Sequence, residues 1–152
     1  MAKAKSKPGR LIGGPEETAF LSIVRTAEVV SHPLVQLLKT HELSVTQYNV
    51  LRILRGAADG LTCGEIANRM ITRDPDITRL LDRLEKRNLI ERARDRKDRR
   101  AVLTRITPHG LEFLAALDEP VQQTHRQTLG HLGAQRLAQL SDLLAVCRDK
   151  DS

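Results

Sequence analysis

Apolar residues recur every three or four positions along most of the chain, a spacing typical of amphipathic helices. Phe20 and Ile23 start one such face, which predicts a helix over about residues 15–31. Pro33 should kink or restart this helix and Pro120 should bend a later one, because proline lacks a backbone N–H and crowds the preceding turn. Further helical faces are predicted around residues 34–38, 48–54, 66–70, 77–84, 111–121 and 134–148, the last burying Leu137, Leu140, Leu143, Leu144 and Cys147.

Helix-start signals precede several of these faces. Ser44 with Gln47, and Thr62 with Glu65, fit the capping box, in which two side chains satisfy free N–H groups at the start of a helix. Asp74-Pro75 combines a capping residue with proline at the first helical position, so the helix over residues 77–84 is expected to begin there.

The pattern changes after Asn88, which suits a left-handed helix C-cap. Residues 89–92 and 101–106 have the pattern of short strands, and they flank a charged stretch over residues 93–100. Thr107-Pro108 then signals the start of another helix. The expected fold is therefore mainly α with a small β hairpin, an α+β arrangement.

The composition favours packed helices in one domain. The chain of 152 residues is large enough to bury a core of its own. Although 40% of the residues are apolar, only 2% are aromatic, so Leu, Ile, Val and Ala must fill that core. Such side chains suit packed helices better than a β-sandwich.

The formal net charge of +6 is concentrated in two segments. Residues 92–105 hold seven basic residues against two aspartates, a net of +5, and the first ten residues add +4. The remainder of the chain is slightly acidic. Localised positive charge favours a polyanion as partner, with nucleic acid the leading candidate. Residues 1–14, rich in Lys, Gly and Ser, are expected to form a disordered basic tail.

Several classes of function find no support in the sequence. No apolar run approaches the ~20 residues that span a bilayer, and no N-terminal stretch resembles a signal peptide, so we expect a cytoplasmic protein with no membrane partner. The five histidines and two cysteines show no metal-binding spacing, and no nucleophile or phosphate-loop motif is present. We therefore expect neither an enzyme nor a bound cofactor or metal.

The order of two helices, a short turn, an amphipathic helix and a basic hairpin is the plan of a winged helix-turn-helix domain. The second helix of the pair fits the major groove, about 12 Å wide, while the hairpin reaches the adjacent backbone or minor groove. The candidate contacts to double-stranded DNA are polar side chains of this helix and its leading end: Thr72, Arg73, Asp76, Thr78, Arg79, Arg83 and Lys86. Arg79 is the best candidate for a bidentate contact with guanine. The alternative is a solvated face whose charges pair with each other, as Asp82 would with Lys86.

Two segments resemble the MarR family of bacterial transcription regulators: residues 77–92, ITRLLDRLEKRNLIER, and residues 95–110, DRKDRRAVLTRITPHG. The resemblance covers about residues 16–150. It implies a homodimer in which the N-terminal helix and the last two helices of each chain interlock, while two winged lobes straddle a pseudo-palindromic operator. The wing residues carried over are Arg96, Lys97, Asp98, Arg99 and Arg100. The family pattern places Arg100 in the minor groove and gives Asp98 an ion pair that helps to hold the wing, and Asn88 stands where relatives usually have Gly.

This resemblance also suggests how the chain is organised. A disordered tail is expected at residues 1–14 and a single domain over residues 15–152. Within that domain we expect a winged lobe at residues 44–107 and dimerisation helices at residues 15–41 and 108–150.

Proteins of this family commonly bind a small aromatic or phenolic effector that weakens DNA binding, so the resemblance implies a repressor that a ligand releases. Arg25, His32, His41 and Tyr48 are the candidates for the effector pocket, against the alternative that they are ordinary surface or interface residues. Cys63, in the first turn of a helix, is the candidate for redox sensing, against a plain role as a small helix-start residue. A winged-helix module that binds an acidic protein is the competing function.

Overall fold

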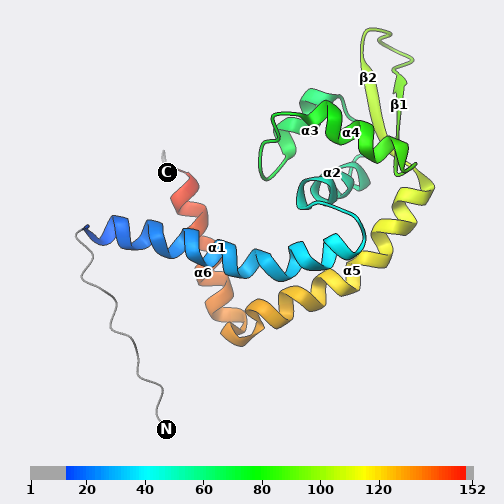
Figure 1. The fold of residues 1–152 in the computed structure, drawn as a ribbon. Coiled ribbons are helices and arrows are strands. Elements are labelled where there is room, and N and C mark those ends of the chain that lie inside the picture. The colour runs from blue at the N-terminus through cyan, green and yellow to red at the C-terminus, as the bar shows by residue number, and fades with distance from the viewer. Residues whose placement is uncertain (1–12, 150–152) are drawn as a thin grey trace.

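The computed structural model describes residues 13–149, and within them helices dominate around one antiparallel hairpin. In chain order the elements are α1 (Pro15–Thr40), α2 (Val45–Arg55), α3 (Cys63–Arg69), α4 (Ile77–Lys86), β1 (Ile90–Arg94), β2 (Val102–Ile106), α5 (Pro108–Leu129), the short 3-10 helix η1 (Gly130–Leu132) and α6 (Gly133–Arg148). Figure 1 shows α2, α3, α4 and the hairpin gathered into one lobe, with α1, α5 and α6 forming an arm that extends from it. This arrangement confirms the predicted fold class. Most of the predicted basic tail lies outside the described residues.

Both predicted capping boxes are present. The Ser44 hydroxyl accepts a hydrogen bond from the Gln47 N–H at 3.1 Å, and the Gln47 side chain accepts one from the Ser44 N–H at 2.9 Å. Thr62 and Glu65 exchange the same pair of bonds at the start of α3. The Thr62 hydroxyl also donates to the Glu65 carboxylate at 3.1 Å. The bonds that this carboxylate accepts, first from the Thr62 backbone and then from the hydroxyl, hold the pKa of Glu65 below its usual value.

The predicted start of α4 is wrong by two residues. The cap is Asp76, whose carboxylate accepts a hydrogen bond from the Arg79 N–H at 3.2 Å, and the helix begins at Ile77. The Asp74 carboxylate instead accepts a hydrogen bond from the Asp76 N–H at 2.8 Å, which closes a turn with Pro75 in the middle. The turn therefore takes up the residues that the Asp74-Pro75 signal assigned to the helix.

The long helices α1 and α5 both continue through an internal proline. The predicted restart of α1 at Pro33 does not occur. Pro33 has no N–H for the Val29 carbonyl, but Val29 and Pro33 are both exposed, so water reaches the carbonyl that loses its partner. Pro120 is likewise exposed and stays within α5.

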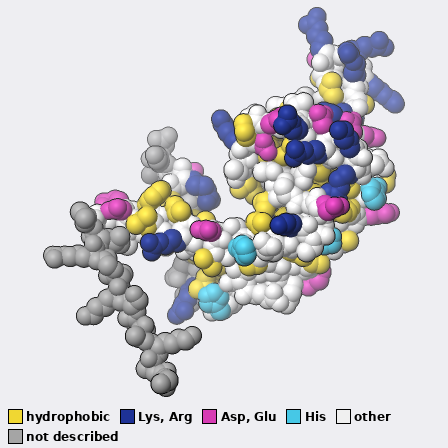
Figure 2. All heavy atoms as spheres, in the orientation of Figure 1, with side chains coloured by type: hydrophobic (Ala, Val, Ile, Leu, Met, Phe, Trp, Pro, Cys, Tyr) yellow, Lys and Arg dark blue, Asp and Glu magenta, His cyan; other side chains and the backbone are white. Residues whose placement is uncertain are grey.

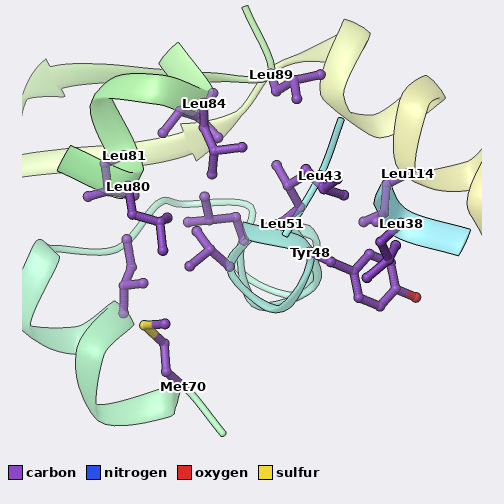
Figure 3. Packing of buried hydrophobic residues seen from close by; sticks show 14 of the residues in the cluster. Leu38, Leu43, Tyr48, Leu51, Met70, Leu80, Leu81, Leu84, Leu89 and Leu114 are labelled. Carbon is purple, nitrogen blue, oxygen red and sulfur yellow. The ribbon is translucent and has the colours of Figure 1, made fainter. Parts of the chain in front are cut away.

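The hydrophobic core lies inside the lobe and extends to the adjoining ends of α1 and α5. Figure 3 shows Leu51 of α2 facing Leu81 and Leu84 of α4, with Leu38 of α1 and Leu114 of α5 at the edge of the cluster. Each of these side chains is at most 1% exposed, and full burial of a leucine stabilises a fold by about 1.5–3 kcal/mol. This core fixes one face of α4 inward, so the opposite face of α4 is directed to solvent.

The arm leaves large apolar side chains uncovered. Phe20 and Val29 of α1 are 62% and 70% exposed, and Leu143 and Val146 of α6 are each 66% exposed. Figure 2 shows this apolar surface where the N-terminal half of α1 lies near α6. The prediction that α6 buries its apolar stripe, with Cys147 in the core, is wrong for the single chain: α6 has no buried residue, and Cys147 is exposed. Within residues 13–149, no other element covers this part of the arm.

The hairpin is fastened to the start of α5 at its base. Asn88 adopts the left-handed conformation predicted for it, with φ of 55°, and its carbonyl accepts a hydrogen bond from the Thr107 hydroxyl at 2.6 Å. Thr107 also caps α5 by accepting the Gly110 N–H at 2.9 Å. A Cβ on Gly110 would lie 2.1 Å from the Leu89 carbonyl oxygen, so only glycine permits this approach. The hairpin therefore starts from a fixed point between α4 and α5.

Candidate nucleic-acid interface

All seven predicted contact residues of the helix-turn-helix lie at the surface of α4 or in the segment just before it. Thr78, Arg79, Arg83 and Lys86 are on the exposed face of α4. Thr72 and Arg73 are exposed in the connection from α3, and Asp76 is the exposed cap. The structure thus gathers these side chains on one side of the lobe, where an extended polyanion can reach them.

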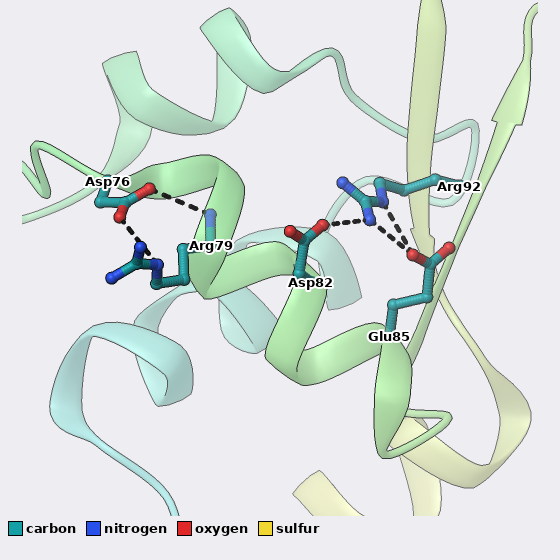
Figure 4. Close-up of polar contacts among 5 residues, drawn as sticks. All are labelled: Asp76, Arg79, Asp82, Glu85 and Arg92. Atoms are coloured by element: carbon teal, nitrogen blue, oxygen red, sulfur yellow. Dashed lines mark hydrogen bonds and ion pairs between the residues drawn. The ribbon is translucent and has the colours of Figure 1, made fainter.

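Asp76 has a second role beside capping, since it also orients Arg79. Its Oδ2 lies 3.2 Å from Arg79 Nε while its Oδ1 accepts the Arg79 N–H (Figure 4). The two terminal guanidinium nitrogens of Arg79 make no hydrogen bond within residues 13–149. This is the end of an arginine that forms a bidentate contact with guanine O6 and N7.

Arg92 is bound to α4 and is not a free cation of the wing. From β1 it donates hydrogen bonds to Asp82 at 2.5 Å and to Glu85 at 2.5 and 3.1 Å (Figure 4). The hydrogen bonds that Arg92 donates, first to Glu85 and then to Asp82, raise the pKa of Arg92 above its usual value. The suggested pairing of Asp82 with Lys86 is therefore wrong, because the hairpin folds back and supplies Asp82 with an arginine. The contact fixes the angle between the wing and α4.

The tip of the hairpin carries exposed cations on an internally bonded turn. Arg96, Lys97, Arg99 and Arg100 are exposed, and within residues 13–149 none of them forms an ion pair. Arg94, also exposed, donates to the Arg99 carbonyl at 3.1 Å. Figure 2 shows these basic side chains projecting from the end of the lobe. The tip is therefore suited to bind phosphates or a groove of strong negative potential.

Asp98 holds this turn through the backbone. Its carboxylate accepts a hydrogen bond from the Arg100 N–H at 3.0 Å, and the Asp98 carbonyl accepts the Ala101 N–H at 3.0 Å. The expectation that Asp98 forms an ion pair is wrong for the described residues, because the carboxylate turns toward the following backbone as in an Asx turn. That Asp98 orients Arg100 stays a prediction, and the bond to the Arg100 N–H is compatible with it.

Two features next to α4 were not found from the sequence. Asn49 of α2 accepts the Ile71 N–H at 2.9 Å and so holds the connection between α3 and α4. A polar hollow of about 250 Å³ separates the start of α2 from α4 and is lined by Ser44, Thr46, Gln47, Asp74, Asp76, Arg79, Leu80 and Arg83. Both features depend on segments that are distant in sequence, and the spacing of residues along the chain gives no signal for such contacts.

The four candidates for an effector pocket lie in different surroundings. Tyr48 is buried in the core under the Arg52 guanidinium, 5.8 Å from the ring centroid, and burial raises the pKa of Tyr48. Arg25 and His32 are exposed on α1, and the exposed His41 packs edge-on against Phe113 at a centroid distance of 6.3 Å.

None of these four residues lines the apolar pocket that the arm forms with α6. That pocket, of about 310 Å³, lies between α1, the end of α5 and α6, and its walls are Ser22, Ile23, Thr26, Ala27, Val30, Leu129, Leu140 and Leu144. A role for the four candidates in effector binding stays a prediction.

The cysteines and the possible metal ligands are the remaining candidates for a functional site. Cys63 is the exposed first residue of the seven-residue helix α3, and Cys147 is exposed on α6. Residues 13–149 contain no group of three or more His, Cys, Asp or Glu side chains placed to hold a metal ion. Over the same range, no helix combines the length and apolar character needed to cross a bilayer.

Known proteins share both the lobe and the arm. The sequence profile of the MarR family matches residues 43–102. A MarR transcription factor from Planctomyces limnophilus is 39% identical, with a TM-score of 0.68 over 90% of this chain and 99% of that one. A mutant MarR from Escherichia coli complexed with operator DNA is 27% identical, with a TM-score of 0.76 over 84% of this chain and 91% of that one.

A third relative, the homoprotocatechuate degradative operon repressor of Escherichia coli, is 23% identical over 84% of this chain and 86% of its own length. These relatives are transcription regulators and not enzymes. Because a 39% identical relative is matched over nearly its whole length and the family profile spans most of the lobe, the chain belongs to the MarR family of winged helix-turn-helix transcriptional regulators.

Proposed function

We propose that this protein is a cytoplasmic homodimeric repressor that binds a pseudo-palindromic operator and is released from it by a small-molecule effector. One observation carries the proposal: the exposed polar face of α4 and the exposed basic wing are linked, because Arg92 of β1 donates hydrogen bonds to Asp82 and Glu85 of α4. A helix and a wing in fixed relation can occupy neighbouring grooves of one duplex.

The roles of the individual residues follow from where they lie. Arg79, oriented by Asp76, reads a guanine in the major groove, while Thr78 and Arg83 contact neighbouring base edges or phosphates. At the wing tip, Arg100 enters the minor groove on a turn held by Asp98. The other cations of the surface neutralise phosphates: Arg73, Lys86, Arg96, Lys97 and Arg99.

The uncovered apolar surface of the arm supports a dimer. Phe20 and Val24 of α1 and Leu143 of α6 are 62%, 49% and 66% exposed in one chain, and monomeric soluble proteins rarely leave such side chains grouped in the open. A two-fold pairing through the arms covers this surface and presents two lobes to one duplex. The operator complex of the Escherichia coli MarR mutant supports DNA as the partner.

Repression and release by a ligand are supported by a named relative and by a pocket of the arm. The relative from Escherichia coli that is named an operon repressor favours negative control. A small aromatic or phenolic effector, bound between the arm and the lobe or in the apolar pocket of about 310 Å³, would change the tilt of α4 or the separation of the two copies of α4. The dimer would then no longer match the half-site spacing.

Binding to the DNA upstream of the protein's own gene tests this proposal. Fluorescence anisotropy at several salt concentrations should give an affinity at least about a thousandfold above that for unrelated DNA at physiological salt. Light scattering should give a dimer, and a panel of phenolic acids should contain a compound that lowers the affinity. Equal, strongly salt-dependent binding to unrelated DNA and to an acidic polypeptide would instead mark the wing as a general polyanion surface, and the proposal would be wrong.

A further inference from the structure

The C-terminal end of α1 is an unusual turn, because a glutamate occupies a left-handed position. The Glu42 N–H donates to the Lys39 carbonyl and the Leu43 N–H donates to the Leu38 carbonyl, each at 3.0 Å, which is the Schellman pattern of a helix end. Glu42 has φ of 54°, where glycine is usual. A non-glycine residue persists there only when its surroundings hold it in place.

Arg87, the residue that follows α4, supplies that support. Its Nη1 donates to the Glu42 carbonyl at 2.6 Å and its Nη2 donates to the His41 carbonyl at 3.1 Å. The same guanidinium lies over the ring of Phe113 on α5, with 5.3 Å between its central carbon and the ring centroid. One partly buried side chain of the lobe is thus bonded to the end of α1 and stacked on α5.

These contacts differ from the others that α4 makes. Leu81 and Leu84 attach α4 to the core of the lobe, and Arg92 attaches the wing to α4. Arg87 instead attaches the C-terminal end of α4 to both long helices of the arm. The bond from Thr107 to Asn88 fastens the next residue to the start of α5. The end of α4 that carries Arg87 is therefore a fixed pivot.

Asp76 and Arg79 lie at the N-terminal end of α4, opposite the end that Arg87 holds. Ten helical residues span about 15 Å, so a tilt of about 10° at the Arg87 end moves the other end by about 2.6 Å. That displacement is close to the spacing of base pairs, about 3.4 Å along one strand. A small change at the pivot is therefore enough to move Arg79 off its base pair.

We propose that Arg87 is a positioning residue that transmits the geometry of the arm to α4 and so sets the half-site spacing that the dimer accepts. This inference rests on the proposed function, since it requires a dimer on a two-part operator. Arg87 itself makes no DNA contact in this account. Its effect is exerted through the direction of α4.

The test compares Arg87→Met with a matched control, Arg55→Met. Methionine keeps the apolar stem of arginine and removes every donor. Arg55 also links lobe and arm, through a 2.9 Å ion pair between α2 and Asp118 of α5, and within residues 13–149 it forms no hydrogen bond or ion pair with α4. Arg87→Lys is the third variant, because lysine can donate to one of the two carbonyls but not in the forked geometry. Circular dichroism and light scattering establish which variants are folded and dimeric.

Affinity is measured on three DNA duplexes built from the operator that the parent protein selects, with its own spacer and with one base pair added or removed. The parent should prefer its own spacing by at least about tenfold, consistent with 1.4 kcal/mol per factor of ten. Arg87→Met should reduce that preference to about threefold or less, with Arg87→Lys in between, while base preference within each half-site is unchanged. Arg55→Met should keep the parental preference.

The outcomes separate this inference from the proposed function. A parent protein that selects no two-part operator overturns the proposed function. A parent with strict spacing, together with Arg87→Met and Arg87→Lys that lose affinity equally on all three duplexes, shows a purely structural arginine and overturns this inference. Equal relaxation by Arg55→Met also overturns it, because any loosening of the lobe would then suffice. If Arg87→Met does not fold, the comparison of Arg87→Lys with the parent decides between the same two results.

Discussion

Replacing Arg92 by methionine should loosen the wing from the recognition helix. Arg92 donates three hydrogen bonds from β1 to Asp82 and Glu85 of α4, at distances between 2.5 and 3.1 Å. Methionine preserves the apolar stem but donates nothing, so two carboxylates remain side by side on α4 without a cation. The wing then loses the contact that fixes its angle, and the surface near the DNA gains uncompensated negative charge.

The loss of stability caused by Arg92→Met can be judged from how exposed the three paired side chains are. Hydrogen bonds to charged groups contribute about 1.5–3 kcal/mol when buried, whereas exposed ion pairs contribute about 0–1 kcal/mol. The Arg92 side chain is 25% exposed, and those of Asp82 and Glu85 are 47% and 40% exposed, so both pairs lie nearer the surface limit. We therefore expect a loss of about 1–2 kcal/mol in the free energy of unfolding, or about 2–8 °C in Tm for a domain of this size.

Urea unfolding followed by circular dichroism measures this loss, at fixed protein concentration because a dimer's stability depends on it. A double-mutant cycle pairs Arg92→Met with the double change Asp82→Asn and Glu85→Gln, and should give a coupling energy of about 1 kcal/mol or more. Arg96→Met is the matched control, since Arg96 has no ion pair within the described residues and should change stability by less than about 0.5 kcal/mol. A coupling energy near zero, or equal losses for Arg92→Met and Arg96→Met, would show that Arg92 does not hold the wing to α4.

Three further predictions concern a strained turn, a helix cap and the wing. Glu42→Gly should raise the free energy of unfolding by about 1 kcal/mol, because glycine adopts φ of 54° without strain; unchanged or lower stability in urea would contradict this. The pKa of Glu65 is lowered by its bonds from Thr62, so its stabilising effect is present above the ordinary value of 4.5 and is lost as the pH falls through the folded pKa. Thermal melts between pH 7 and pH 3 should therefore show the parent losing stability relative to Glu65→Gln, which does not titrate, whereas parallel curves would mean that the carboxylate contributes nothing. Arg100→Ala should weaken operator binding and reduce the slope of log affinity against log salt by about 1, and tight binding across a whole salt series would show that the wing assignment is wrong.

Local signals predicted much of the fold. The capping boxes at Ser44 and Thr62 and the cap at Thr107 depend on residues three positions apart, so sequence spacing specifies them directly. The left-handed residue at Asn88 was likewise predicted, because asparagine tolerates that conformation. At the start of α4 the same reasoning failed, since Asp74 and Asp76 are both good caps and the choice between them depends on how the turn packs.

Contacts between distant segments could not be predicted in this way. The hairpin brings Arg92 back onto Asp82 and Glu85, and the core brings Arg87 against the end of α1, yet neither pairing has a local signature. The exposure of Leu143 and Cys147 on α6 was missed for a different reason. Periodicity shows that a face is apolar, but it does not say whether the same chain or another copy covers that face.

Selection of bound DNA from a random-sequence pool measures both the sequence and the symmetry of the sites that the protein prefers. If α4 and the wing of each chain bind adjacent grooves and two chains act together, the selected sequences should share two inverted half-sites whose centres lie about 10 base pairs apart, one turn of the duplex. Parallel selection with Arg79→Ala should lose preference at one position in each half-site and keep the spacing. A pool that shows no enrichment, or enrichment without inverted symmetry, would show that the protein is not a dimer reading a two-part operator.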